Sequence, residues 1–185
     1  MLRNTPQCNT GWKASSFILK DYDGKSHNLA EQSGGKGLLI AFICNHCPYV
    51  RAIADRLVDD AFELQMLGIN VLAVMSNDYR RVPEDAPENM KQFSKRFGFT
   101  FPYLVDENQD VARAYGAVCT PDFFGFNSSG ELQYRGRLDE ARMGDASGCN
   151  RELVNAMKQI AETGKGPARQ MASIGCSIKW IGSGS

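Results

Sequence analysis

The chain has 185 residues and a formal net charge of zero, with 21 Lys and Arg residues against 21 Asp and Glu residues. This length is typical of one domain with a terminal extension. Its 43% hydrophobic and 23% charged residues predict a globular protein and exclude an intrinsically disordered chain. The balanced charge gives no electrostatic basis for binding nucleic acid or an anionic membrane.

Export and membrane signals are absent from the sequence. The first ten residues hold no apolar stretch that could form a signal-peptide core. The longest apolar run, 38–44, is far shorter than the about 20 residues of a membrane span. We therefore expect a cytoplasmic protein, in which thiols stay reduced and paired cysteines serve catalysis or metal binding rather than structure.

The first half of the chain predicts a β-hairpin and then alternating strands and helices. The turn 21–24 lies between a strand at 16–19 and a weaker strand after it. The apolar run 38–43 predicts a strand buried on both faces, and 69–75 predicts a second one. One amphipathic helix is expected after the first of these strands, because apolar residues recur there at helical spacing: Val50, Ile53, Ala54, Leu57, Val58 and Ala61.

The second half continues the alternation. After a loop at 76–85, in which the acidic segment 84–88 is expected to be solvated, Met90, Phe93 and Phe97 mark a helix. The segment 101–106 predicts an edge strand, because Pro102 cannot donate to a central ladder. A short helix at 110–115, a hairpin of strands 123–126 and 132–137, a helix around 153–160 and an irregular segment from residue 164 complete the prediction.

This order predicts an α/β fold with a central mixed β-sheet, helices on both faces and an N-terminal β-hairpin extension. We expect one domain over residues 1–165 and a C-terminal tail, 166–185, that packs on it.

A Cys-x-x-Cys motif follows the first buried strand. Cys44-Asn45-His46-Cys47 lies where that strand ends and a helix begins. The unpaired N–H groups and partial positive charge of a helix N-terminus stabilise a thiolate, and this motif lowers the pKa of cysteine. We therefore expect Cys44 to be the exposed, acidic nucleophile and Cys47 the more buried resolving thiol. His46 can place positive charge near the thiolate, and Pro48 fits the first helical turn.

Other interpretations of the motif remain open. Zinc would need two more ligands, and neither a second Cys-x-x-Cys nor a His-x-His pair is present, so no metal site is expected. A copper chaperone using Cys44, Cys47 and His46 is a further alternative, since soft thiolates select Cu(I). The sequence also lacks phosphate-loop and dinucleotide motifs, and no cofactor is expected.

Several segments together resemble one family. The chain is similar to the thioredoxin-like superfamily and, within it, to the redoxin or AhpC/TSA branch of peroxiredoxin-like proteins. The matching segments cover most of the chain: residues 42–50, 76–78, 83–88, 118–124, 134–139 and 174–180. The resemblance implies a thioredoxin fold in which Pro121 is a cis-proline packed against the cysteine pair. It also implies that Thr120 offers its backbone to a substrate cysteine.

The resemblance does not specify a single catalytic mechanism. Peroxiredoxins carry Thr or Ser three residues before the peroxidatic cysteine and Pro four residues earlier, but Cys44 and Ile40 stand there when Cys47 is aligned. Ile43 also replaces the Trp of ordinary thioredoxins. We therefore expect Cys44 to attack, and Arg135 or Arg137 to orient a peroxide only if the protein is a peroxidase.

Four further cysteines have open roles. Cys119 precedes the expected cis-proline and is either within reach of Cys44 or a small buried thiol. Cys176 lies in the tail, where it either resolves an oxidised thiol or packs in the core. Cys8 and Cys149 show no partner in the sequence pattern.

The sequence thus predicts a thiol–disulfide oxidoreductase that acts through Cys44 and Cys47. A thiol-dependent peroxidase with an antioxidant role is the alternative. Expected partners are protein or small-molecule disulfides and thiols, or a hydroperoxide, with thioredoxin reductase or glutathione as electron donor. The oligomeric state is not predictable from this sequence.

Overall fold

The computed structural model describes residues 1–32 and 35–182. Residues 33–34, in the expected loop before the first buried strand, and 183–185, at the end of the expected tail, lie outside the described residues. The main sheet has the strand order β3-β2-β6-β5-β4-β8-β9. Its strands are β2 (Ile18–Asp21), β3 (Ser26–Asn28), β4 (Gly37–Phe42), β5 (Ile69–Met75), β6 (Tyr103–Val105), β8 (Asp122–Asn127) and β9 (Leu132–Gly136).

The sheet is mixed, as predicted. Strand β4 pairs in parallel with β5 and antiparallel with β8. All six residues of β4 are buried, because helices cover both faces of the sheet. Alternate side chains therefore enter two separate cores, with Leu39 and Ala41 in one and Ile40 and Phe42 in the other.

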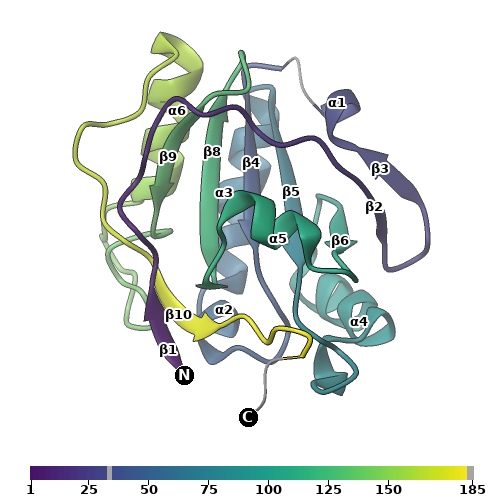
Figure 1. The fold of residues 1–185 in the computed structure, drawn as a ribbon. Coiled ribbons are helices and arrows are strands. Elements are labelled where there is room, and N and C mark those ends of the chain that lie inside the picture. The colour runs from purple at the N-terminus through teal and green to yellow at the C-terminus, as the bar shows by residue number, and fades with distance from the viewer. Residues whose placement is uncertain (33–34, 183–185) are drawn as a thin grey trace.

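Helices lie on both faces, as Figure 1 shows. The helices α3 (Ala54–Met66), α4 (Pro87–Phe97) and α6 (Glu152–Thr163) contribute Leu57, Met90 and Met157 to the first core. The short helix α5 (Asp110–Tyr115) covers the opposite face and contributes Tyr115 to the second. A further one-turn helix, α1 (Leu29–Gln32), follows β3. Among the described residues, no helix combines the length and apolar character needed to cross a bilayer.

The C-terminal segment is more regular than expected. It contains strand β10 (Ile174–Ser177), which lies between β1 (Leu2–Asn4) and β7 (Cys119–Thr120) in a second, three-stranded sheet. Gly175 allows this close approach, because a Cβ atom there would lie 1.9 Å from the carbonyl oxygen of Thr120. The prediction of an irregular chain from residue 164 is therefore wrong for 174–177.

Two other expectations need correction. Strand β6 is internal, since β2 and β5 flank it. Pro102 lies before the strand, and its carbonyl oxygen accepts a 2.9 Å hydrogen bond from the backbone N–H of Ala73. The single helix expected after Cys47 is two helices, α2 (Pro48–Arg51) and α3. At the break, Ile53 donates to Val50 three residues earlier rather than four, yet its side chain stays buried. The rest of the apolar stripe is buried as well, apart from Val58, which is partly buried.

Candidate active site

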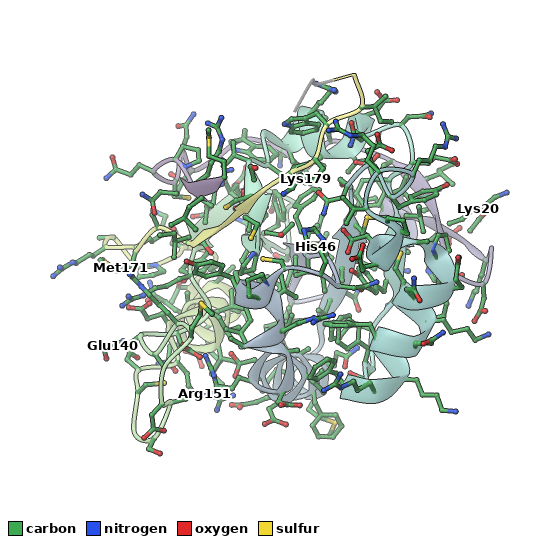
Figure 2. All side chains as sticks on the ribbon, turned by 90° about the horizontal axis from the view of Figure 1, so that it is seen from below. Lys20, His46, Glu140, Arg151, Met171 and Lys179 are labelled. Carbon is green, nitrogen blue, oxygen red and sulfur yellow. The ribbon has the colours of Figure 1, made fainter. Side chains whose placement is uncertain are left out.

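The Cys-x-x-Cys motif lies at the junction between β4 and α2, as predicted. Cys47 is the N-cap residue of α2, and Pro48 is its first helical residue, where the missing N–H costs no hydrogen bond. In Figure 2, which looks at this end of the molecule, His46 lies near the start of α2 and the yellow strand β10 runs close by. The six cysteines are all free thiols in the structure.

Thr120, just before β8, contacts both thiols of the motif. Its peptide bond to Pro121 is cis, which confirms that expectation. The hydroxyl oxygen of Thr120 lies 3.2 Å from the sulfur of Cys44. The sulfur of Cys47 lies 3.1 Å from the carbonyl oxygen of the same residue. One residue beside the cis-proline therefore contacts both cysteines of the motif.

The acidic thiol of the pair is Cys47. A hydrogen bond from the Cys44 thiol lowers the pKa of Cys47 to about 4, against the opposing effect of burial. The backbone N–H groups of Cys176 and Val50 and the Thr120 hydroxyl lower this pKa further. Cys47 is also the N-cap residue of α2, where the partial positive charge of a helix N-terminus favours a thiolate.

The expectation that Cys44 is the exposed thiol is wrong. Cys44 and Cys47 are both 0% exposed. Burial raises the pKa of Cys44 well above its usual value, and the hydrogen bond to Cys47 and the charge of Asp85 raise it further. Cys44 therefore stays protonated and acts as the donor to Cys47.

Asp85 holds the turn between the two cysteines. It belongs to the 3₁₀ turn η1 (Pro83–Asp85), and it is completely buried. One carboxylate oxygen accepts from the backbone N–H groups of Asn45 (2.7 Å) and His46 (3.1 Å). The other accepts from Nδ1 of His46 (2.6 Å) and Nδ2 of Asn77 (2.8 Å). The carboxylate thus fixes the backbone of both residues between the cysteines.

The sequence interpretation missed this carboxylate, because the segment 84–88 was expected to be solvated. Burial raises the pKa of Asp85, but the hydrogen bonds from His46 and Asn77 outweigh it and leave the pKa below its usual value. A second missed residue is Tyr103, whose buried hydroxyl donates to Oδ1 of Asn45 at 3.1 Å. Its only sequence signal is a position in a short strand.

The Cys44, His46 and Asp85 side chains are also the group that could hold a metal ion within the described residues. Their donor atoms lie within 4.8 Å of one another. However, Nδ1 of His46 is shared between Asp85 at 2.6 Å and the sulfur of Cys44 at 3.6 Å. Asp85 already accepts four hydrogen bonds. The cluster is therefore satisfied as a hydrogen-bond network, in which a metal ion would have to replace existing contacts.

Cys176, in the C-terminal segment, lies beside the two thiols of the motif. It pairs with Thr120 in the register of β10 and β7, and α2 packs against β10. Its thiol interacts with the sulfur of Cys47, and it is partly exposed. Burial and this contact raise the pKa of Cys176 to about 11. The structure thus places the tail cysteine directly beside the motif.

The other cysteines lie apart from this contact. Burial raises the pKa of Cys119, and its thiol donates to the carbonyl oxygen of Pro121 at 3.7 Å. Cys119 therefore fits the expectation of a small buried thiol. Cys8 lies against the second core and Cys149 lines a surface depression beside α3.

The two arginines considered for peroxide binding are engaged elsewhere. Arg135 is buried and donates to both carboxylate oxygens of Asp122, at 3.2 and 2.8 Å. Arg137 donates to Oε1 of Glu152 at 2.9 Å. These contacts engage both guanidinium groups, and that of Arg135 is not free to bind a peroxide while it holds Asp122.

The paired thiols at a strand–helix junction, packed against a cis-proline loop on a mixed sheet, define a thioredoxin-fold protein. Residues 10–135 match the AhpC/TSA family, and the chain belongs to that family. An uncharacterised conserved protein from Geobacillus kaustophilus, seen in a crystal structure, is similar over the whole chain. It is 38% identical, with a TM-score of 0.91, over 100% of this chain and 98% of that protein.

Two other similar proteins carry functional names. The thioredoxin domain of a thiol-disulfide oxidoreductase from Bacteroides vulgatus shares the fold at 18% identity, with a TM-score of 0.65 over 84% of this chain and 99% of that domain. The thiol-disulfide oxidoreductase ResA of Halalkalibacterium halodurans is 29% identical over 66% of this chain. That match spans 65% of the relative, slightly less than two thirds of its length.

Proposed function

We propose that this protein is a thiol–disulfide oxidoreductase that uses Cys44 and Cys47 as its redox pair. The observation that carries the proposal is the contact of both thiols with Thr120, beside the cis peptide bond to Pro121. Two thiols that hydrogen-bond to each other can form a disulfide with little movement, and one of them has a strongly lowered pKa. The name of the similar ResA protein supports the same activity.

The proposed cycle begins at Cys47. Its thiolate attacks one sulfur of a substrate disulfide, and the other substrate sulfur leaves as a thiolate. Cys44 then loses its proton and attacks the Cys47 sulfur, which releases the second substrate thiol and leaves a Cys44–Cys47 disulfide. These roles reverse the order expected from the sequence, because Cys47 rather than Cys44 is the acidic thiol. A thiol donor such as glutathione, or thioredoxin reductase, would return the pair to its reduced state.

Reduction of insulin disulfides tests this activity. We expect the wild-type protein to catalyse reduction with glutathione or thioredoxin reductase as donor, and the Cys44→Ser and Cys47→Ser variants to lose turnover. Cys149→Ser, which lies apart from the motif beside α3, is the matched control and should retain the full rate. Equal activity in all four proteins would contradict the proposal.

The reduction potential of the pair decides the direction of the reaction. A value of about −270 mV is typical of a reductant, and about −120 mV of an oxidant. Because the lowered pKa of Cys47 stabilises the reduced form, we expect a potential on the oxidising side of about −270 mV. Equilibration with glutathione redox buffers measures it.

A thiol-dependent peroxidase is the second candidate. It is favoured by the acidity of Cys47. It is disfavoured by Ile40 and Cys44, which stand where a peroxidatic Cys47 would require Pro and Thr or Ser. It is disfavoured by the ion pair that occupies Arg135. Peroxide consumption that survives in Cys44→Ser and is lost in Cys47→Ser would favour this second function. The cytoplasmic location remains a prediction, which fractionation of the source cells would test.

A further inference from the structure

Three thiols, rather than two, meet at the candidate site. Cys47 interacts with Cys44 within the motif and with Cys176 on β10. The backbone N–H of Cys176 also points to the Cys47 sulfur. Cys47 is thus the shared partner of a thiol 3 residues before it and of a thiol from the far end of the chain.

The position of Cys176 is determined by backbone pairing. Cys176 is the register partner of Thr120, whose hydroxyl and carbonyl contact the two motif cysteines. Gly175 permits this, since any larger residue would overlap the Thr120 carbonyl oxygen. Strand β1 pairs with β10 on its other side and holds it in place.

Exposure separates Cys176 from the pair. Cys44 and Cys47 are 0% exposed, whereas Cys176 is partly exposed. An external thiol would therefore reach a disulfide confined to Cys44 and Cys47 less readily than one that includes Cys176. A disulfide that includes Cys176 would present one sulfur toward the surface.

We propose that Cys176 is a third redox residue. It replaces Cys44 as the disulfide partner of Cys47 and thereby moves the disulfide from the buried pair toward the surface. The inference rests on the proposed oxidoreductase function. It assigns the entry point of the electron donor, a small thiol or a protein dithiol, to the sulfur of Cys176.

The exchange is balanced and redox-neutral. Cys176 gives up its proton and attacks the Cys47 sulfur of the Cys44–Cys47 disulfide. That bond breaks, a Cys47–Cys176 disulfide forms, and Cys44 leaves as a thiolate and takes up a proton. A donor thiolate then attacks the Cys176 sulfur, and Cys47 leaves as a thiolate. A second donor thiol releases Cys176, so that two donor thiols become one donor disulfide.

The pKa values of the two cysteines favour attack of the donor thiolate on the Cys176 sulfur rather than on the Cys47 sulfur. A thiol of low pKa is the better leaving group, and the pKa of Cys47 is about 4 against about 11 for Cys176. Attack at Cys176 therefore expels the stabilised thiolate. The ammonium group of Lys179 acts electrostatically on Cys176, which favours the approach of an anionic thiol such as glutathione.

Oxidation of a Cys44→Ser variant tests the proposal. With oxidised glutathione, we expect Cys47 first to form a mixed disulfide and Cys176 then to displace the glutathione. Peptide mapping without reductant should identify a Cys47–Cys176 disulfide. Because a neighbouring thiol acts at millimolar or higher effective concentration, glutathione release should be at least about tenfold faster than in Cys44→Ser/Cys176→Ser.

Controls separate this proposal from the underlying function. Cys44→Ser/Cys119→Ser removes a nearby buried thiol and should still form the Cys47–Cys176 disulfide. Circular dichroism verifies that each variant is folded, and Cys176→Ala serves in place of Cys176→Ser if the latter unfolds. If wild-type protein forms no Cys44–Cys47 disulfide, the proposed function fails. If it does, but Cys44→Ser retains glutathione as long as the double variant, the role of Cys176 is overturned.

Discussion

Nδ1 of His46 lies 2.6 Å from Oδ2 of Asp85, and the same nitrogen lies 3.6 Å from the sulfur of Cys44. The shorter contact places the Nδ1 proton toward the carboxylate. His46 therefore cannot accept the Cys44 proton through this nitrogen while that hydrogen bond exists. The pair instead fixes the turn between the cysteines and places the negative charge of Asp85 close to Cys44, which keeps that thiol protonated.

The first prediction concerns Asp85→Asn. The substitution removes a buried charge and places an NH₂ group against donors on His46 and Asn77. Loss of one partner of a buried pair costs about 3 kcal/mol or more, so we expect a loss of this size in the free energy of unfolding. It also removes an electrostatic effect that raises the pKa of Cys44, so this pKa should fall.

Chemical denaturation and thiol alkylation against pH measure the two effects. The matched control is Asp59→Asn, on the exposed side of α3, which should change stability by less than about 0.5 kcal/mol. A stable Asp85→Asn protein with an unchanged alkylation profile would show that Asp85 does not organise the site.

The second prediction concerns the hydroxyl group of Thr120. In Thr120→Val this group is lost with little change in shape. Its oxygen lies 3.2 Å from the sulfur of Cys44, and its hydrogen bond also lowers the pKa of Cys47. A hydrogen bond to a charged group contributes about 1.5–3 kcal/mol. Since about 1.4 kcal/mol corresponds to one pKa unit, we expect the pKa of Cys47 to rise by about one unit. Ultraviolet absorbance of the thiolate measures this, and Thr120→Ser, which keeps the hydroxyl, should retain the wild-type value.

The strands, helices and motif that could be predicted have local sequence signals. The apolar runs that form β4 and β5 and the turn between β8 and β9 each specify their own structure within a few residues. The position of the Cys-x-x-Cys motif follows from the end of β4. These features do not depend on which distant segments pack against them.

The features that were missed depend on distant contacts. Strands β7 and β10 have two and four residues, too few for a periodic pattern, and they form because they pair with each other. Asp85 lies in an acidic, proline-rich segment that looks solvated, and it is buried only because the motif supplies its donors. The acidity of Cys47 likewise needs N–H groups from β10 as well as from α2. Local spacing carries no signal for such contacts.

The third prediction concerns the pH dependence of stability in the reduced protein. The pKa of Cys47 is lowered to about 4 in the folded state from an ordinary value near 9. Between these values the unfolded chain binds the proton and the native protein does not, so stability rises with pH and is lost as pH falls toward 4. The slope approaches at most about 1.4 kcal/mol per pH unit. Denaturation with reductant at several pH values measures it, and Cys47→Ser should remove this contribution.

The final prediction separates a structural from a catalytic role for Arg135. Burial raises the pKa of Asp122 to about 6 despite the ion pair with Arg135, so removal of the guanidinium leaves a buried carboxylate without its counter-ion. We expect Arg135→Met to lower the free energy of unfolding by about 3–5 kcal/mol at neutral pH. The loss should diminish at acidic pH, where Asp122 becomes protonated. The control is Arg80→Met, because the Arg80 pair with Glu107 is exposed and should contribute less than about 1 kcal/mol. A fully stable Arg135→Met protein that has lost peroxide consumption would instead assign Arg135 to catalysis.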